Sequence, residues 1–181
     1  NAGSAINTGA YNISLGGNAG TAITTGNRNI AIGYGALDSE DTASDCIAIG
    51  HNALTAQNTD SSNNVAIGYA AASALNGGTD SVYVGYYAGG VGAITGDHNV
   101  VVGKGAALNA VGMATSVFIG KDTGGGGVVA GAANTVVGEA AGYALTSGAS
   151  NVLIGKSAGL NFTDNNQNIA IGSNALDAAV A

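Results

Sequence analysis

A five-residue pattern, Asn-apolar-x-apolar-Gly, recurs along the whole chain. Its alternating apolar positions are typical of a short β-strand. The repeat is too short for a strand-helix-strand unit, and we find no sustained helical stripe of apolar residues. We therefore predict an all-β fold, a parallel β-solenoid of about ten coils with one strand per coil. The closing glycines, 17 or 18 residues apart, are Gly16, Gly33, Gly50, Gly68, Gly85, Gly103, Gly120, Gly138, Gly155 and Gly172.

Aligning the ten copies predicts which side chains point into the coil. The second and fourth positions, such as Ile30 and Ile32, are β-branched or leucine except at Thr135, and we expect them to point inward. Three residues after each closing glycine only alanine or threonine occurs, which indicates a tight inward corner. The closing glycine indicates either a bend with positive φ or two backbones too close for a Cβ.

The first position of the pattern predicts a ladder of stacked polar side chains. Amides stacked at the spacing of neighbouring parallel strands can hydrogen-bond from coil to coil, and so satisfy groups that a turn leaves unpaired. Cys46 takes this position in the third coil and is expected to interrupt the ladder. The asparagines of this Asn ladder are Asn12, Asn29, Asn64, Asn99, Asn134, Asn151 and Asn168.

The third position of the pattern is expected to point outward. It is apolar or aromatic in every copy except at Ser14. A strand that is apolar on both faces is buried on both, which predicts that another copy of the chain covers this face. The alternative is a weakly apolar exposed face, since half of these residues are Ala or Ser. The expected oligomer interface is strongest at Tyr83, Val101, Phe118, Val136 and Leu153.

The position after each closing glycine carries the best candidates for ligand binding. In four consecutive coils it holds Tyr34, His51, Tyr69 and Tyr86, which would form one outward ladder. Aromatic rings with polar tips suit contacts with a host glycan or a protein partner. The alternative is that ring stacking merely stiffens the rod. The column continues as Lys104, Lys121, Glu139 and Lys156, a charged stripe that we expect to be solvated.

The repeat unit resembles the head repeats of YadA-like trimeric autotransporter adhesins and the repeats of phage tail fibres. Residues 64–69 (NVAIGY) and 168–172 (NIAIG) carry the resemblance, which covers nearly all of the chain, although the period is longer here. It implies a left-handed β-roll, a homotrimer and attachment to host surfaces. We therefore expect residues 1–181 to be a structural or adhesive segment of a longer extracellular, cell-surface or virion fibre. A filament subunit that stacks end to end is the alternative.

Composition narrows the classes of partner. With 46% hydrophobic residues the chain is expected to fold despite its 32 glycines. A formal charge of −7 with only four basic residues does not suit a phosphate backbone, so we expect no nucleic-acid partner. No apolar run approaches the length needed to span a bilayer.

Enzymatic chemistry is not expected. His51 and His98 lie nearly three coils apart, and the six-residue sub-period of β-helix acyltransferases, the remote enzyme alternative, is missing. The G-x-S-x-G match at residues 155–159 falls on repeat columns and is a coincidence. We expect no cofactor. Calcium is a weak alternative at the acidic group of Asp38, Glu40, Asp41 and Asp45.

Overall fold

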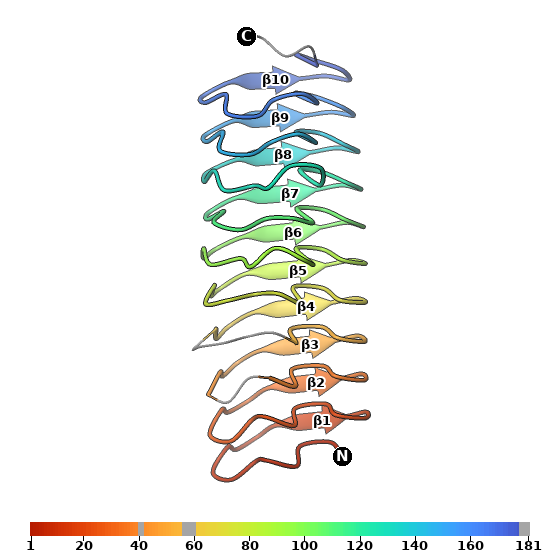
Figure 1. Cartoon of the computed structure of the whole chain (residues 1–181), viewed down its shortest axis with the longest axis vertical. Coiled ribbons are helices and arrows are strands. Elements are labelled where there is room, and N and C mark those ends of the chain that lie inside the picture. The colour runs from red at the N-terminus through yellow and green to blue at the C-terminus, as the bar shows by residue number, and fades with distance from the viewer. Residues whose placement is uncertain (40–41, 56–60, 178–181) are drawn as a thin grey trace.

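The computed structural model is a rod in which one short strand per repeat stacks on the next (Figure 1). It describes residues 1–39, 42–55 and 61–177, and no helix occurs within these ranges. The strands form one parallel sheet in the order β1 to β10, and equivalent residues of successive repeats pair in register. The predicted parallel β-solenoid is confirmed. Its strands are β1 (Ile13–Leu15), β2 (Ile30–Ile32), β3 (Ile47–Ile49), β4 (Val65–Ile67), β5 (Val82–Val84), β6 (Val100–Val102), β7 (Val117–Ile119), β8 (Thr135–Val137), β9 (Val152–Ile154) and β10 (Ile169–Ile171).

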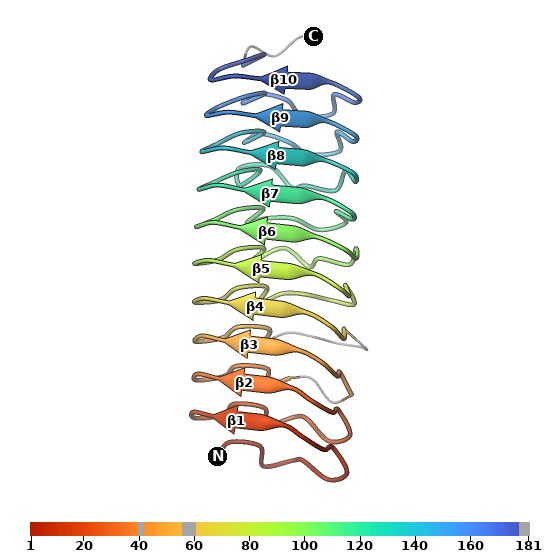
Figure 2. The same ribbon diagram turned by 180° about the vertical axis from the view of Figure 1, so that it is seen from behind.

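The coil winds in a left-handed sense. In Figure 2 the strands lie on the near side and run to the left while the chain rises from β1 to β10. The connecting arcs return on the far side, so the sheet forms one wall of the rod and the arcs form the others.

The closing glycines are required for both reasons that the repeat suggested. Their φ angles lie between 124° and 138°, where side chains are disfavoured. In the first nine coils, a Cβ on this glycine would lie 2.3–2.7 Å from the carbonyl oxygen of the next closing glycine. The inward corner is confirmed as well, because Ala36 and Ala106 are completely buried and Thr123 donates its hydroxyl to Gly138 O at 2.9 Å.

The middle residue of each strand, not its two neighbours, points into the coil. A three-residue strand places its ends on one face and its middle on the other. Because the chain turns at both ends of the strand, the narrow interior takes one side chain and the outer face takes two. Our inward assignment of the second and fourth positions is therefore wrong.

The predicted oligomer interface is wrong for the same reason. Its five residues are completely buried inside their own chain and belong to the core; they are Tyr83, Val101, Phe118, Val136 and Leu153. Burial raises the pKa of the Tyr83 phenol to about 12. From the arcs, large side chains such as Ile94, Met113 and Phe162 complete the core.

In most coils two residues six positions apart share the core volume, although both are small at Ser14 and Gly20 and at Ala66 and Ala72. Where the middle residue is large, its partner is glycine: a Cβ on Gly124 would lie 2.6 Å from Phe118 Cε1. Where the middle residue is Ala48, the partner is the buried Leu54. Gly124 and Leu54 have nearly the same φ, 58° and 52°, so the two solutions share one backbone. A cramped interior of constant width explains this exchange of volume.

Candidate functional site

The candidate sites lie on the outside of the rod. No cavity or cleft opens in the described part of the chain. Nor do the described residues include a helix suited in length and hydropathy to crossing a membrane. Three features run along the rod: the aromatic ladder with the charged stripe that continues it, the outer face of the sheet, and the two polar ladders at the start of the strands.

The predicted aromatic ladder is confirmed in its geometry. The rings of Tyr34 and His51 stack with centroids 5.3 Å apart, and His51 stacks on Tyr69 at 5.1 Å. Tyr69 stacks on Tyr86 at 5.2 Å, and the three interplanar angles lie between 13° and 23°. All four side chains are exposed. The ladder follows directly from the repeat, because each ring occupies the same position in successive coils.

Two further side chains hold the C-terminal end of the ladder. Tyr87 packs edge-on against Tyr69 at 5.4 Å and against Tyr86 at 4.8 Å, a contact that the alignment of columns did not predict. The proximity of Tyr69 raises the pKa of Tyr87. The ammonium group of Lys104 lies over the Tyr86 ring, 5.8 Å from its centroid, within the range of a cation–π contact.

The charged stripe beyond the ladder is exposed, and its side chains form ion pairs. Lys121 Nζ lies 2.6 Å from Asp122 Oδ2, and this contact raises the pKa of Lys121. Lys156 Nζ lies 3.3 Å from Glu139 Oε2. These pairs contribute little to stability because water screens them, and the stripe is the solvated surface that we expected.

The outer face of the sheet is the surface that the sequence interpretation placed inside. Two side chains per strand point outward there, and nineteen of the twenty are Ile, Val or Leu, with Thr135 the exception. Even in the middle of the sheet they remain open to solvent, with Ile67 38% and Ile119 39% exposed. We call this surface the aliphatic face. It runs the full length of the sheet.

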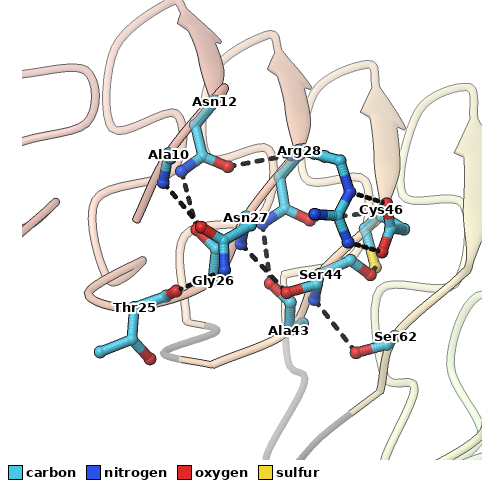
Figure 3. A network of polar contacts seen from close by, with 12 residues as sticks. Ala10, Asn12, Thr25, Gly26, Asn27, Arg28, Ala43, Ser44, Cys46 and Ser62 are labelled. Atoms are coloured by element: carbon cyan, nitrogen blue, oxygen red, sulfur yellow. Dashed lines mark hydrogen bonds and ion pairs between the residues drawn. The ribbon is translucent and has the colours of Figure 1, made fainter. Parts of the chain in front are cut away.

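The Asn ladder is confirmed as a chain of hydrogen bonds from coil to coil (Figure 3). The backbone N–H of Asn29 donates to Asn12 Oδ1 at 2.9 Å, and the N–H of Cys46 donates to Asn29 Oδ1 at 3.0 Å. Serine continues the ladder, since the N–H of Asn99 donates to Ser81 Oγ at 2.9 Å. Cys46 places a weaker acceptor in this column, and its Sγ–H donates to the carbonyl of Ser61 at 3.2 Å.

A second polar ladder lies two residues before the first and was not predicted. Here the N–H of one coil donates to a side chain of the next: Asn27 N–H to Ser44 Oγ, and Ser44 N–H to Ser62 Oγ, both at 3.0 Å (Figure 3). Thr79 N–H donates to Asp97 Oδ1 in the same way, at 2.7 Å. The signal in the sequence is a column of short polar residues, which resembles ordinary turn composition and so escapes notice.

Replacing Asn134 by alanine is expected to lower the free energy of unfolding by about 3 kcal/mol. The buried Asn134 amide accepts the N–H of Asn151 at 3.0 Å and donates to the carbonyl of Gly148 at 2.8 Å, so alanine leaves both groups unpaired. Asn134→Ser should cost clearly less, because Ser81 and Ser116 already serve in this column. Urea denaturation of the two variants tests this, and equal losses would contradict a hydrogen-bonding role.

Among the described residues, the remaining candidates do not assemble into a site. Asp45 is engaged by Arg28 through two hydrogen bonds of 2.6 and 2.7 Å, which lower the pKa of Asp45. Glu40 and Asp41 lie outside the described residues, and within the described ones no three potential metal ligands gather. His98 Nε2 lies 4.0 Å from Asp80 Oδ2, whereas His51 belongs to the aromatic ladder, so the two histidines share no partner.

Two surfaces therefore stand out, the aliphatic face and the aromatic ladder. The first is a broad apolar plane along the sheet, and the second is a narrow row of rings with polar tips. The chain matches no known protein family, no curated protein and no solved structure.

Proposed function

We propose that the chain is a structural or adhesive segment of an extracellular or virion fibre and that it works as a homo-oligomer joined through the aliphatic face. The observation that carries this proposal is the pair of columns on the outside of the sheet, in which every side chain except Thr135 is aliphatic. A soluble monomer rarely exposes an apolar patch of this extent, and such patches mark interaction surfaces.

A second copy of the same chain is the best occupant of this face. This face belongs to one continuous sheet, and its side chains recur at the spacing of the strands. Its best complement is therefore a surface with the same spacing. The apolar contact would be rimmed by exposed polar residues, those just before the Asn ladder, such as Arg28 and Asp45, on one side and the ring and charge column on the other, as in other protein interfaces. Three copies are proposed from the resemblance to adhesin heads and tail fibres.

The rod itself suits a structural role. Each coil packs only on its neighbours, and hydrogen bonds between equivalent positions recur in every coil. The four basic residues offer few sites to trypsin-like proteases, which is useful outside a cell. A non-enzymatic role is part of the proposal, and the aromatic ladder and the arcs would then supply any adhesive contact.

The double variant Val102→Lys/Ile119→Lys is expected to be monomeric, whereas the unaltered chain forms a discrete oligomer. Two ammonium groups in the middle of the aliphatic face cannot be buried against a second copy without a partner charge. Light scattering measures the mass, and three times 17.2 kDa is expected for the unaltered chain.

The matched control for this experiment is Val91→Lys. Val91 is an exposed valine, 52% accessible, and lies in an arc rather than in a strand, so its charge should leave the mass unchanged. An unaltered chain that stays monomeric at high concentration would overturn the proposed interface. Filaments of unlimited length would instead favour end-to-end stacking.

A further inference from the structure

The aromatic ladder exposes ring edges and polar tips rather than ring faces. The faces of His51 and Tyr69 are occupied by their neighbours, with centroids 5.1–5.3 Å apart on both sides. The outward edges stay accessible, with Tyr34 57% and Tyr86 50% exposed. A ligand for the ladder therefore meets a row of phenol and imidazole groups, which donate and accept hydrogen bonds, beside C–H edges. That combination favours a hydroxyl-rich, partly apolar partner over a purely apolar one.

The ladder also imposes a repeat on its ligand. Its spacing is set by the stacking of parallel strands, because each ring belongs to one coil. A glucopyranose residue in a fully extended β-1,4-linked glucan has nearly the same length along its chain, and its hydroxyls are equatorial and lie at the edges of the ring. An α-1,4-linked glycan coils and cannot keep this register. We infer that the aromatic ladder binds an extended β-1,4-linked polysaccharide whose long axis runs along the rod.

The ladder is braced by neighbouring side chains before any ligand arrives. Tyr87 wedges edge-on against Tyr69 and Tyr86, and Lys104 lies over the Tyr86 ring. Fixed side chains lose little conformational entropy on binding, which favours affinity. Lys104 adds a hydrogen-bond donor at the C-terminal end of the row. At the other end the column begins with Gly17, whose lack of a side chain leaves the Tyr34 ring uncovered by this position.

Binding to the unaltered chain is expected for cellohexaose and not for maltohexaose, its α-linked counterpart, in isothermal titration. Tyr69→Ala removes the ring that three others contact, and it should weaken cellohexaose binding by at least about tenfold. Tyr69→Phe keeps the stack and removes one hydroxyl, so its loss should be smaller. Tyr11→Ala is the matched control, because Tyr11 is an exposed tyrosine outside the ladder, and binding should be unchanged.

Three outcomes would overturn the inference. They are the absence of cellohexaose binding at millimolar concentration, equal binding of maltohexaose, and equal affinities of the Tyr69→Ala variant and the unaltered chain. Thermal melting of each variant shows whether it is folded. Light scattering of the same samples reports the oligomer separately, so failure of glycan binding and failure of the proposed fibre interface are distinguishable.

Discussion

Replacing Gly103 by alanine is expected to lower the free energy of unfolding by about 3 kcal/mol or more. Two independent effects act at this position. The φ of Gly103 is 138°, and a Cβ there would lie 2.4 Å from the carbonyl oxygen of Gly120 in the next coil. Relief of the clash requires the two coils to separate, which breaks the strand pairing of β6 with β7. Because each coil is stabilised by its neighbours, the loss spreads along the rod.

Gly112→Ala is the control for this prediction. A Cβ on Gly112 meets nothing closer than Ala130 O at 3.8 Å, and its φ lies outside the left-handed region. The substitution should change stability by less than about 1 kcal/mol, in either direction. Urea denaturation of the two variants provides the comparison. If Gly103→Ala and Gly112→Ala behaved alike, the close approach of the closing glycines would not limit the fold.

The sequence predicted the features that depend only on repetition. Once the coils stack in register, every column of the alignment becomes a column in space. The Asn ladder, the ring stack of Tyr34 to Tyr86 and the clash of the closing glycines follow from that step alone. The packing of Tyr87 depends on the shape of the arcs, which vary in sequence from coil to coil, and it was missed. The second polar ladder repeats like the first, but its short polar residues resemble ordinary turn composition, so it was missed as well.

Alternation along the strand did not reveal which of its two faces is inside. A period of two separates the faces without labelling them, and here both are apolar. The sizes of the residues indicate which column is inside. The outer columns are nearly uniform Ile and Val, whereas the middle column ranges in size from Ala48 to Phe118 and Tyr83. Only residues in an enclosed column need a partner that compensates for their size. The overlooked signal was therefore the residue six positions after the middle one, which is Leu54 after the small Ala48 and Gly124 after the large Phe118.

That exchange leads to the second large prediction. Phe118→Ala is expected to cost about 3–5 kcal/mol, because it leaves a cavity in a closed coil. Gly124→Leu alone should also destabilise strongly, since its Cβ would lie 2.6 Å from Phe118 Cε1. The double variant recreates the Ala48 and Leu54 pair on a backbone with matching φ. It should be more stable than either single variant, with a coupling energy of about 2 kcal/mol or more.

Chemical denaturation of the four proteins in this mutant cycle measures the coupling. Phe118→Ala combined with Gly112→Ala is the control, because a Cβ on Gly112 would not contact Phe118. The effects of these two substitutions on stability should therefore add to within about 0.5 kcal/mol. Additive losses in the Phe118 and Gly124 cycle would mean that the arcs adjust to each residue separately. A strong coupling would show that the coil has a fixed internal width, and that this width, rather than hydrophobicity, decides which residues each repeat accepts.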